Sequence, residues 1–291
     1  ISFLAILLSF GFINGSNSSQ SEALSRNLAT SFATISETEF IELENSPLQY
    51  QKSTRPSLSE IDEVFEGFSS IHVEENISYL ISDFSLCSFN KKQITNYSLI
   101  PLYDSSLGFN GKELLISGNE IEENFEEVIV NTEFENLLGC DALNKEIVLS
   151  SSSTVTYSTG NEKQPFVKDT LSYNKKFLIK GVVKEFSFLN TPKIYYSYLG
   201  AKNYLKSELM ENVSFYLGRP VSYFNYLESC KNDDAICSYS YYIFLDNKND
   251  MNRFYDKVKV LSENENKIQV SSTAYDVKET YSTFISSFSS S

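Results

Sequence analysis

Histidine, glycine, proline and tryptophan are scarce in this chain, and their scarcity excludes several kinds of site. The 291 residues include a single histidine, His72, and four cysteines that form no CxxC pair. A zinc site takes about four His, Cys or carboxylate ligands, and a Ser-His or Cys-His pair needs a histidine beside its nucleophile. No Gly-rich phosphate loop occurs either. We therefore expect no catalysis, no cofactor and no metal, with His72 at the surface.

Positive charge is also in short supply. Lys and Arg number 24 against 38 Asp and Glu, which gives a formal net charge of −14. Without a basic face, nucleic acid is not an expected partner. Apolar residues make up 41% of the chain and charged residues 21%, which is typical of a folded protein. Its many aromatic residues favour strands.

What is present begins with an apolar stretch at residues 1–13, ISFLAILLSFGFI. A membrane-spanning helix needs roughly 20 such residues. The stretch therefore suits either the end of a transmembrane helix, over residues 1–15, or the remnant of a secretory signal. We favour the helix. The tail at 281–291 has apolar residues at helical spacing and suits a lead into the next membrane helix. Both interpretations place the folded part outside the cytoplasm, and the favoured one places it on a cell membrane.

A strand-helix-strand pattern occurs twice, once near each end. The first copy runs from residue 37 to about residue 89. Before it, Leu24, Leu28, Phe32 and Ile35 form one helical stripe, which predicts an N-terminal stalk helix. A strand at 38–44 follows. The sequence SLSE at 57–60 is a capping box that opens a helix to about residue 68, and residues 76–89 read as a strand.

The second copy repeats this order over 238–273. It comprises a strand at 239–245, a polar turn at 246–250, a helix and a strand at 268–272. Met251, Phe254, Val258 and Leu261 fall on one face of the helix. Two such units packed side by side make a split, ferredoxin-like sandwich. Its predicted core comprises Phe40, Val64, Phe65, Ile81, Phe244, Phe254 and Val258.

The residues between the two copies form a β-rich block. Residues 127–131 predict a strand, and residues 132–138 a short helix that ends at Gly139. Strands are expected at 145–149 and 154–157, with a turn at 158–161. The apolar run at 177–186 predicts a strand in which Gly181 marks a bulge or a close backbone approach. An aromatic edge strand is expected at 194–198, and a helical pattern covers 202–226.

Two groups of residues are candidates for a special role. Cys230 and Cys237 flank a short polar loop whose length suits a disulfide bond. An acidic run comprises Glu120, Glu122, Glu123, Glu126 and Glu127. Runs of charge usually form a solvated face, but this run is also a possible surface for a cationic partner.

Four segments, taken in order, resemble a known family. They are EEVIVNTEFENLLG, KEIVL, KKFLIKGVVKEF and TPKIYYSY. In that order they are similar to the extracytoplasmic core domain of MacB-like, FtsX-like ABC transporter permeases. The resemblance implies an α+β fold in which a β-rich, Sabre-like insertion interrupts a porter-like subdomain. The implied boundaries are 16–97 for the stalk helix and first porter half, 98–236 for the insertion and 237–280 for the second half.

The resemblance also implies a function and partners. Such a permease forms a homo- or heterodimer and couples ATP hydrolysis by a cytoplasmic ABC ATPase to export or sensing. The substrate would be a peptide, an antibiotic or a lipoprotein. This domain would carry the motion and perform no chemistry. The alternative is a secreted or surface-anchored binding or adhesion module.

Overall fold

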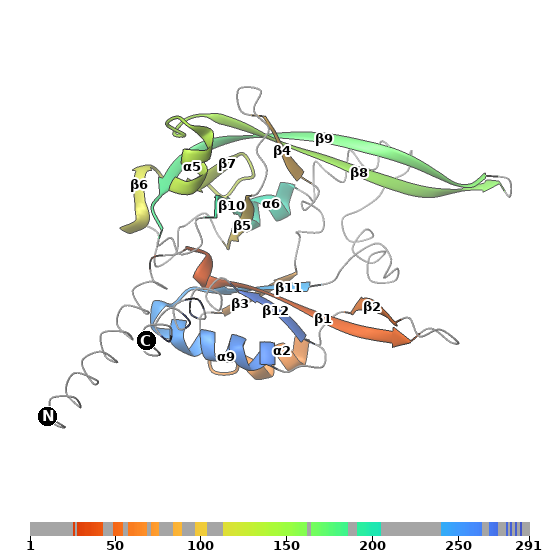
Figure 1. Cartoon of the computed structure of the whole chain (residues 1–291), viewed down its shortest axis with the longest axis horizontal. Helices are drawn as coiled ribbons and strands as arrows, with labels where there is room; N and C mark the ends of the chain where they lie inside the picture. Colours follow the sequence, from red (N-terminus) through yellow and green to blue (C-terminus); the bar gives the residue numbers. More distant parts are fainter. Residues whose placement is uncertain are drawn as a thin grey trace, which may run out of the picture.

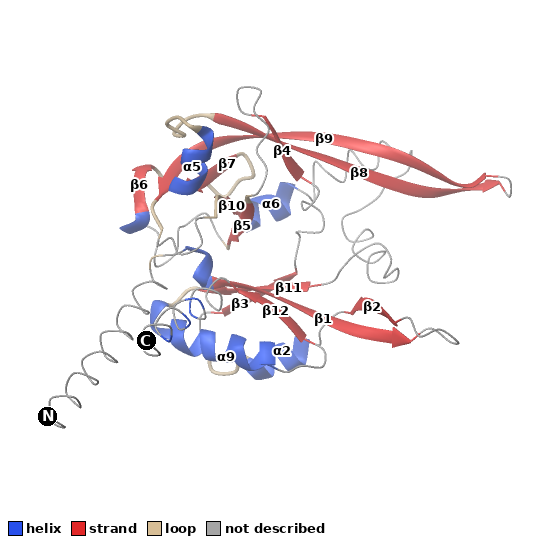
Figure 2. Cartoon of the chain, in the orientation of Figure 1, coloured by secondary structure: helices blue, strands red, loops and turns tan. Residues whose placement is uncertain are grey.

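The structure is a computed structural model of the chain. It describes residues 28–42, 49–54, 58–68, 71–75, 84–88, 97–103, 113–161, 164–185, 191–204, 240–263 and 268–272, with residues 26, 278, 280, 283 and 286. Within them the fold is mixed α+β, with a five-stranded sheet, a seven-stranded sheet and four α-helices (Figures 1 and 2). The predicted α+β class is confirmed. No helix in the described part of the chain has the length and apolar character needed to span a bilayer.

The five-stranded sheet, called here the first sheet, is built from both ends of the chain. Its order is β12 (Ile268–Ser272), β1 (Phe32–Glu42), β11 (Ser240–Leu245), β3 (Ile71–Glu75), and β2 (Gln49–Thr54) pairs with β1. Because β1 is antiparallel to both β11 and β12, the unit β11-α9-β12 holds β1 between its strands. The unit β1-α2-β3 holds β11 in the same way.

Two helices cover one face of the first sheet (Figure 1). They are α2 (Leu58–Val64) and α9 (Met251–Glu263). Predicted core residues Phe65, Phe254 and Val258 are buried in one cluster there, and Val64 packs against it. Phe244 differs from the prediction, because it lies on the opposite face of β11. The side chain of Phe40 and the residue Ile81 lie outside what the structure describes.

The stalk helix predicted through Ile35 is wrong in its described part. Leu28–Ser31 form a 3₁₀ turn, η1, and β1 begins at Phe32. Ala33 and Ile35 are buried beneath the helices, and this alternation is that of a strand. The backbone of β1 pairs with β11 on one side and with β12 on the other. These hydrogen bonds between strands stabilise the extended conformation more than the helical spacing of apolar residues favours a helix.

The strand predicted at 76–89 is tested only over residues 84–88, which do form a strand. The described strand of the first sheet in this region, β3, ends at Glu75, and residues 76–83 lie outside the described ranges. Phe84–Ser88 form β4, which pairs with β8 in the other sheet. The first copy of the pattern therefore contributes to both sheets.

The seven-stranded sheet, called here the second sheet, contains a long hairpin (Figure 1). Its order is β4, β8 (Glu146–Asn161), β9 (Gln164–Val183), β7 (Glu127–Asn131), β10 (Lys193–Ser197), β5 (Ser98–Leu102), with β6 (Leu115–Gly118) on β9. The two strands predicted at 145–149 and 154–157 are one strand, β8. The turn predicted at 158–161 is wrong, because β8 stays paired with β9 as far as Asn161 and Gln164.

Other predictions in the second sheet fare better. Thr132–Leu138 form the helix α5, which Asn131 caps, and Gly139 ends it with φ 68°. Gly181 marks a close approach, since a Cβ there would lie 2.7 Å from the carbonyl oxygen of Asn119. By contrast, the edge position predicted for the strand at 194–198 is wrong, because β10 is buried along its whole length between β7 and β5.

The two sheets meet through aromatic side chains. Tyr242 and Phe244 of β11 point away from α2 and α9 and join the core of the second sheet. Phe32 contacts both of them. Tyr198, at the start of α6 (Tyr198–Tyr204), also packs on both rings. This face of β11 therefore ties the strand-helix-strand units to the second sheet.

Candidate functional site

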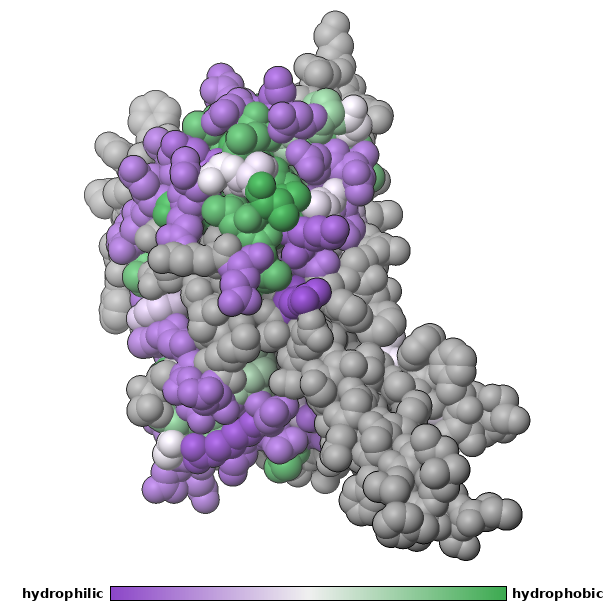
Figure 3. Space-filling model, turned by 90° about the vertical axis from the view of Figure 1, so that its left-hand side faces the viewer, coloured by the Kyte–Doolittle hydropathy of each residue, from purple (hydrophilic) through white to green (hydrophobic). Residues whose placement is uncertain are grey.

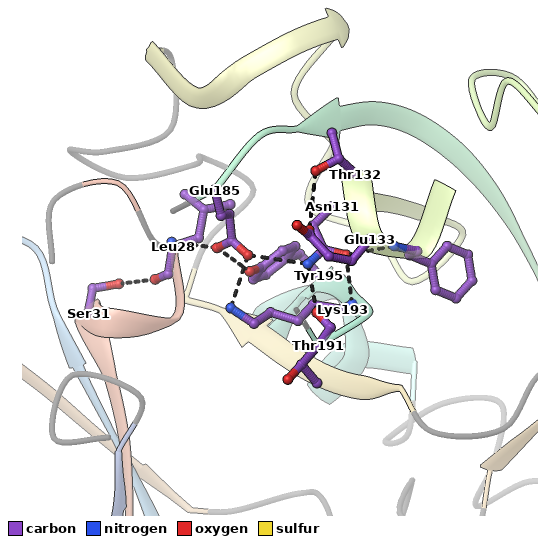
Figure 4. A network of polar contacts seen from close by, with 10 residues as sticks. Leu28, Ser31, Asn131, Thr132, Glu133, Glu185, Thr191, Lys193 and Tyr195 are labelled. Atoms are coloured by element: carbon purple, nitrogen blue, oxygen red, sulfur yellow. Dashed lines mark hydrogen bonds and ion pairs between the residues drawn. The ribbon is translucent and has the colours of Figure 1, made fainter. Parts of the chain in front are cut away.

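A buried polar network lies in the second sheet, where the ends of β7 and β9 meet the start of β10. β7 is parallel to β9 and antiparallel to β10. Consequently the end of β7 at Asn131, the residues after β9 and the start of β10 at Lys193 converge. Glu185 follows β9 in the run FLIKGVVKEF, so the register places a carboxylate, an amide and an ammonium group at one point (Figure 4).

Glu185 is the centre of this network. Its Oε1 accepts a hydrogen bond from the Tyr195 hydroxyl at 2.5 Å and from the Leu28 backbone amide at 2.8 Å. Its Oε2 forms an ion pair with Lys193 Nζ at 3.0 Å, and Asn131 Nδ2 lies 3.5 Å away. The side chains of Glu185 and Lys193 are only 2% and 9% exposed. A charge buried so deeply needs this number of partners.

Asn131 connects the network to the backbone. Its Oδ1 accepts hydrogen bonds from the amides of Phe134 and Lys193, at 3.1 and 2.9 Å. Its Nδ2 donates to the carbonyl oxygen of Thr191 at 2.8 Å. The residue thus caps α5 and also fixes the chain where it enters β10.

Tyr195 is fully buried, and its pKa lies well above the ordinary tyrosine value. Burial is the main cause, because it disfavours a charged phenolate. The negative charge of Glu185 and the hydrogen bond to it raise the pKa further, and Glu133 adds to the effect. Tyr195 is therefore a neutral hydrogen-bond donor at physiological pH.

The network has the character of a structural clamp. Both carboxylate oxygens of Glu185 are occupied by donors of the chain itself, and the side chain is almost fully buried. No group of three or more potential metal ligands occurs among the described residues. The arrangement holds three strand ends and the 3₁₀ turn together. Sequence reasoning missed it, although charged residues at the ends of two apolar strands were a signal.

The histidine lies at the junction of the two sheets. His72 Nε2 is 2.6 Å from Asp246 Oδ2, and its ring stacks on Tyr103, which follows β5. Nearby, Lys202 Nζ on α6 lies 2.7 Å from Glu74 Oε2 on β3. The His72 side chain is 36% exposed, so it lies partly at the surface while it contacts Asp246 and Tyr103.

The acidic run forms a loop anchored by two apolar residues. Ile121 and Phe125 are buried, and Phe125 packs on Phe177. Glu122, Glu123 and Glu126 are exposed, whereas Glu120 and Glu127 are half-buried. Glu127 pairs with Lys180 at 3.1 Å and also accepts a hydrogen bond from the Glu122 amide. A partner-facing role for this run remains a prediction.

Other candidate features are less defined. Cys230 and Cys237 lie outside the described residues, so their disulfide stays a prediction.

The face that carries α5 and β6 shows apolar side chains among hydrophilic ones (Figure 3). Two of the exposed large apolar residues lie on these elements, Leu137 at 38% and Ile116 at 54%.

No protein-family model matches the chain, and no curated protein matches it.

Proposed function

We propose that the chain is the extracytoplasmic domain of an ABC transporter permease of the MacB-like, FtsX-like kind. One observation carries this proposal. Ala33, at the start of β1, pairs with Ser272, at the end of β12. The first sheet is thus entered and left by the chain at adjacent points. A domain suspended from two membrane helices needs such an arrangement.

The topology of the first sheet supports the finer architecture that we propose. Two interleaved strand-helix-strand units with the order β12-β1-β11-β3 suit a split, ferredoxin-like sandwich. We assign this sheet and its helices to a porter-like subdomain. The second sheet, whose described strands except β4 fall between residues 98 and 197, would then be the Sabre-like insertion.

The proposed mechanism is mechanical. Motion of membrane helices would enter through the chain segments that adjoin β1 and β12. From β1 it would pass through Phe32 to Tyr242 and Phe244 of β11. From these two rings it would reach Tyr198, which directly follows β10 of the second sheet. A cytoplasmic ABC ATPase would supply the energy, and a second permease chain would complete the dimer. A peptide, antibiotic or lipoprotein would be the substrate on the extracytoplasmic side of the cell membrane.

Distance measurements on the full-length protein in membranes test the proposal. Ile116 on β6 and Val260 on α9 are 54% and 59% exposed, so cysteines introduced there accept spin labels after the native cysteines have been replaced. We expect the distances between labels within a dimer to change when ATP and vanadate are added. A matched sample whose ATPase cannot bind nucleotide should show no change in these distances.

An unchanged distance distribution in a verified complex with an active ATPase would contradict the coupling mechanism. Full-length protein that washes off membranes at alkaline pH would contradict the permease assignment altogether. That second outcome would favour the alternative, a secreted or surface-anchored binding or adhesion module.

A further inference from the structure

The segment before β1 is attached to the second sheet by a contact between residues far apart in the sequence. Leu28 opens the 3₁₀ turn, so its amide has no acceptor within that turn. Glu185, which lies 157 positions along the chain, provides the acceptor at 2.8 Å. Leu28 and Ala29 are 2% and 0% exposed and pack in a cluster with Leu102, Leu114, Ile121, Ile129, Val183 and Tyr195. Figure 4 shows the turn reaching the network from one side.

We propose that Leu28–Ser31 act as a docking segment that binds and leaves the second sheet as a unit, with Glu185 as its catch. The other contacts of the Glu185 carboxylate can persist when the segment leaves. Without the Leu28 amide, Glu185 still has Lys193, Tyr195 and Asn131 as partners. Undocking therefore breaks the charge-assisted hydrogen bond from the Leu28 amide to Glu185 and exposes a small apolar cluster, and it leaves no buried carboxylate unpaired.

Docking links the second sheet directly to the segment that leads into β1. The segment continues into β1, which begins at Phe32 and pairs with both β11 and β12. Displacing the segment would change the contact between the sheets without unfolding either of them. Its use as the point where membrane motion enters rests on the proposed function, whereas docking itself does not.

Two substitutions at one position isolate the hydrogen bond. Leu28→Ala and Leu28→Pro both shorten the buried side chain, but only proline also removes the amide. Proline is tolerated at the first position of a helical turn. Docking is followed in the full chain by the alkylation rate of a reporter thiol, Ala29→Cys, after the native cysteines have been replaced. Ala142→Cys, a residue equally buried in the second sheet, is the matched control.

We expect the thiol at position 29 to be alkylated faster in Leu28→Pro than in Leu28→Ala, by on the order of tenfold to a hundredfold, the range for one hydrogen bond to a charged group. The rate at position 142 should be the same in both. Equal rates at position 29 would overturn the role of Glu185 as catch. Equal acceleration at both positions would overturn independent docking.

The same two substitutions at Leu28, made in a chain that lacks the ion pair, control for the restriction that proline places on the backbone. Glu185→Leu combined with Lys193→Met replaces the ion pair by apolar groups, which proteins often tolerate. In this background the difference between Leu28→Pro and Leu28→Ala should vanish. If it persists, the backbone restriction and not the lost hydrogen bond explains the effect, and the proposal fails. None of these measurements involves transport, so their outcome is independent of the permease assignment.

Discussion

The imidazole ring of His72 stacks on the phenol ring of Tyr103, with centroids 4.1 Å apart and planes at 10°. His72 belongs to β3 of the first sheet, and Tyr103 follows β5 of the second. Asp246, which follows β11, holds the imidazole from the side at 2.6 Å. A single side chain thus joins three elements at the junction of the two sheets.

Replacing His72 separates the stack from the hydrogen bond. His72→Phe keeps a flat ring that can lie on Tyr103, whereas His72→Ala loses both interactions. We expect alanine to cost more than phenylalanine, by about 0.5–1.5 kcal/mol, the range for an aromatic pair. Urea unfolding of both variants measures the difference. Equal costs would mean that the stack contributes nothing to stability.

Phe254 anchors the helices to the first sheet. It is fully buried and stacks on Phe65 at 5.8 Å between centroids. Phe254→Ala should lower the free energy of unfolding by about 3–5 kcal/mol, because it removes a buried ring and leaves a cavity. Val260→Ala is the control on the same helix, at 59% exposure, and should change stability by less than about 0.5 kcal/mol. A similar loss in both variants would contradict the assignment of the buried face.

Two buried tyrosines should make the fold sensitive to alkali. Burial raises the pKa of Tyr195 and of Tyr196 well above 10.0, with Glu185 adding to the first and Tyr242 to the second. Above that pH the unfolded chain loses these protons while the native state retains them. Their contribution to stability is therefore complete below pH 10 and is lost as pH rises further.

Unfolding free energies measured between pH 8 and 12 check this expectation, and Tyr195→Phe with Tyr196→Phe is the control. The double variant should show a shallower fall in stability across the alkaline range. An equally steep fall would assign the alkaline sensitivity to other groups.

The ion pair of Glu185 and Lys193 should be more costly to break than to replace. Lys193→Met alone leaves a buried carboxylate without its counter-ion and should cost about 3–5 kcal/mol. Adding Glu185→Leu removes that carboxylate and should recover much of the loss. A double-mutant cycle by urea unfolding measures the recovery. If the double variant is no more stable than Lys193→Met, the charge pair is not the dominant interaction.

The cysteines allow a direct chemical test. A disulfide between Cys230 and Cys237 would lower the intact mass by about two mass units, since its formation removes two hydrogen atoms, and extracellular location would favour it. Mass measurement of unreduced and reduced protein after alkylation decides the matter. Two alkylated thiols at these positions in unreduced protein would exclude the bond.

Local patterns determined those elements whose signals are complete within a few residues. The spacing of Met251, Phe254, Val258 and Leu261 predicts α9, since a helix with one apolar face has few alternatives. Asn131 and Gly139 likewise set the start and end of α5, because a cap bonds to the turn beside it.

Tertiary structure decided the elements whose sequence fits two conformations. Phe32 and Ile35 suit a helical stripe and a strand equally, and pairing with β11 and β12 selects the strand. β10 became a central strand because β5 and β7 flank it, although its aromatic residues suggested an edge.

The sequence by itself determined that the protein is α+β and contains two strand-helix-strand units. The reason is that the spacing of apolar residues within a short segment indicates whether it forms a helix or a strand. The buried network was decided by the tertiary structure alone. Leu28, Asn131, Glu185 and Lys193 span more than half of the chain, and only the register of β7, β9 and β10 brings them together. Hydrogen bonds between such distant residues depend on strand pairing, which no local pattern encodes.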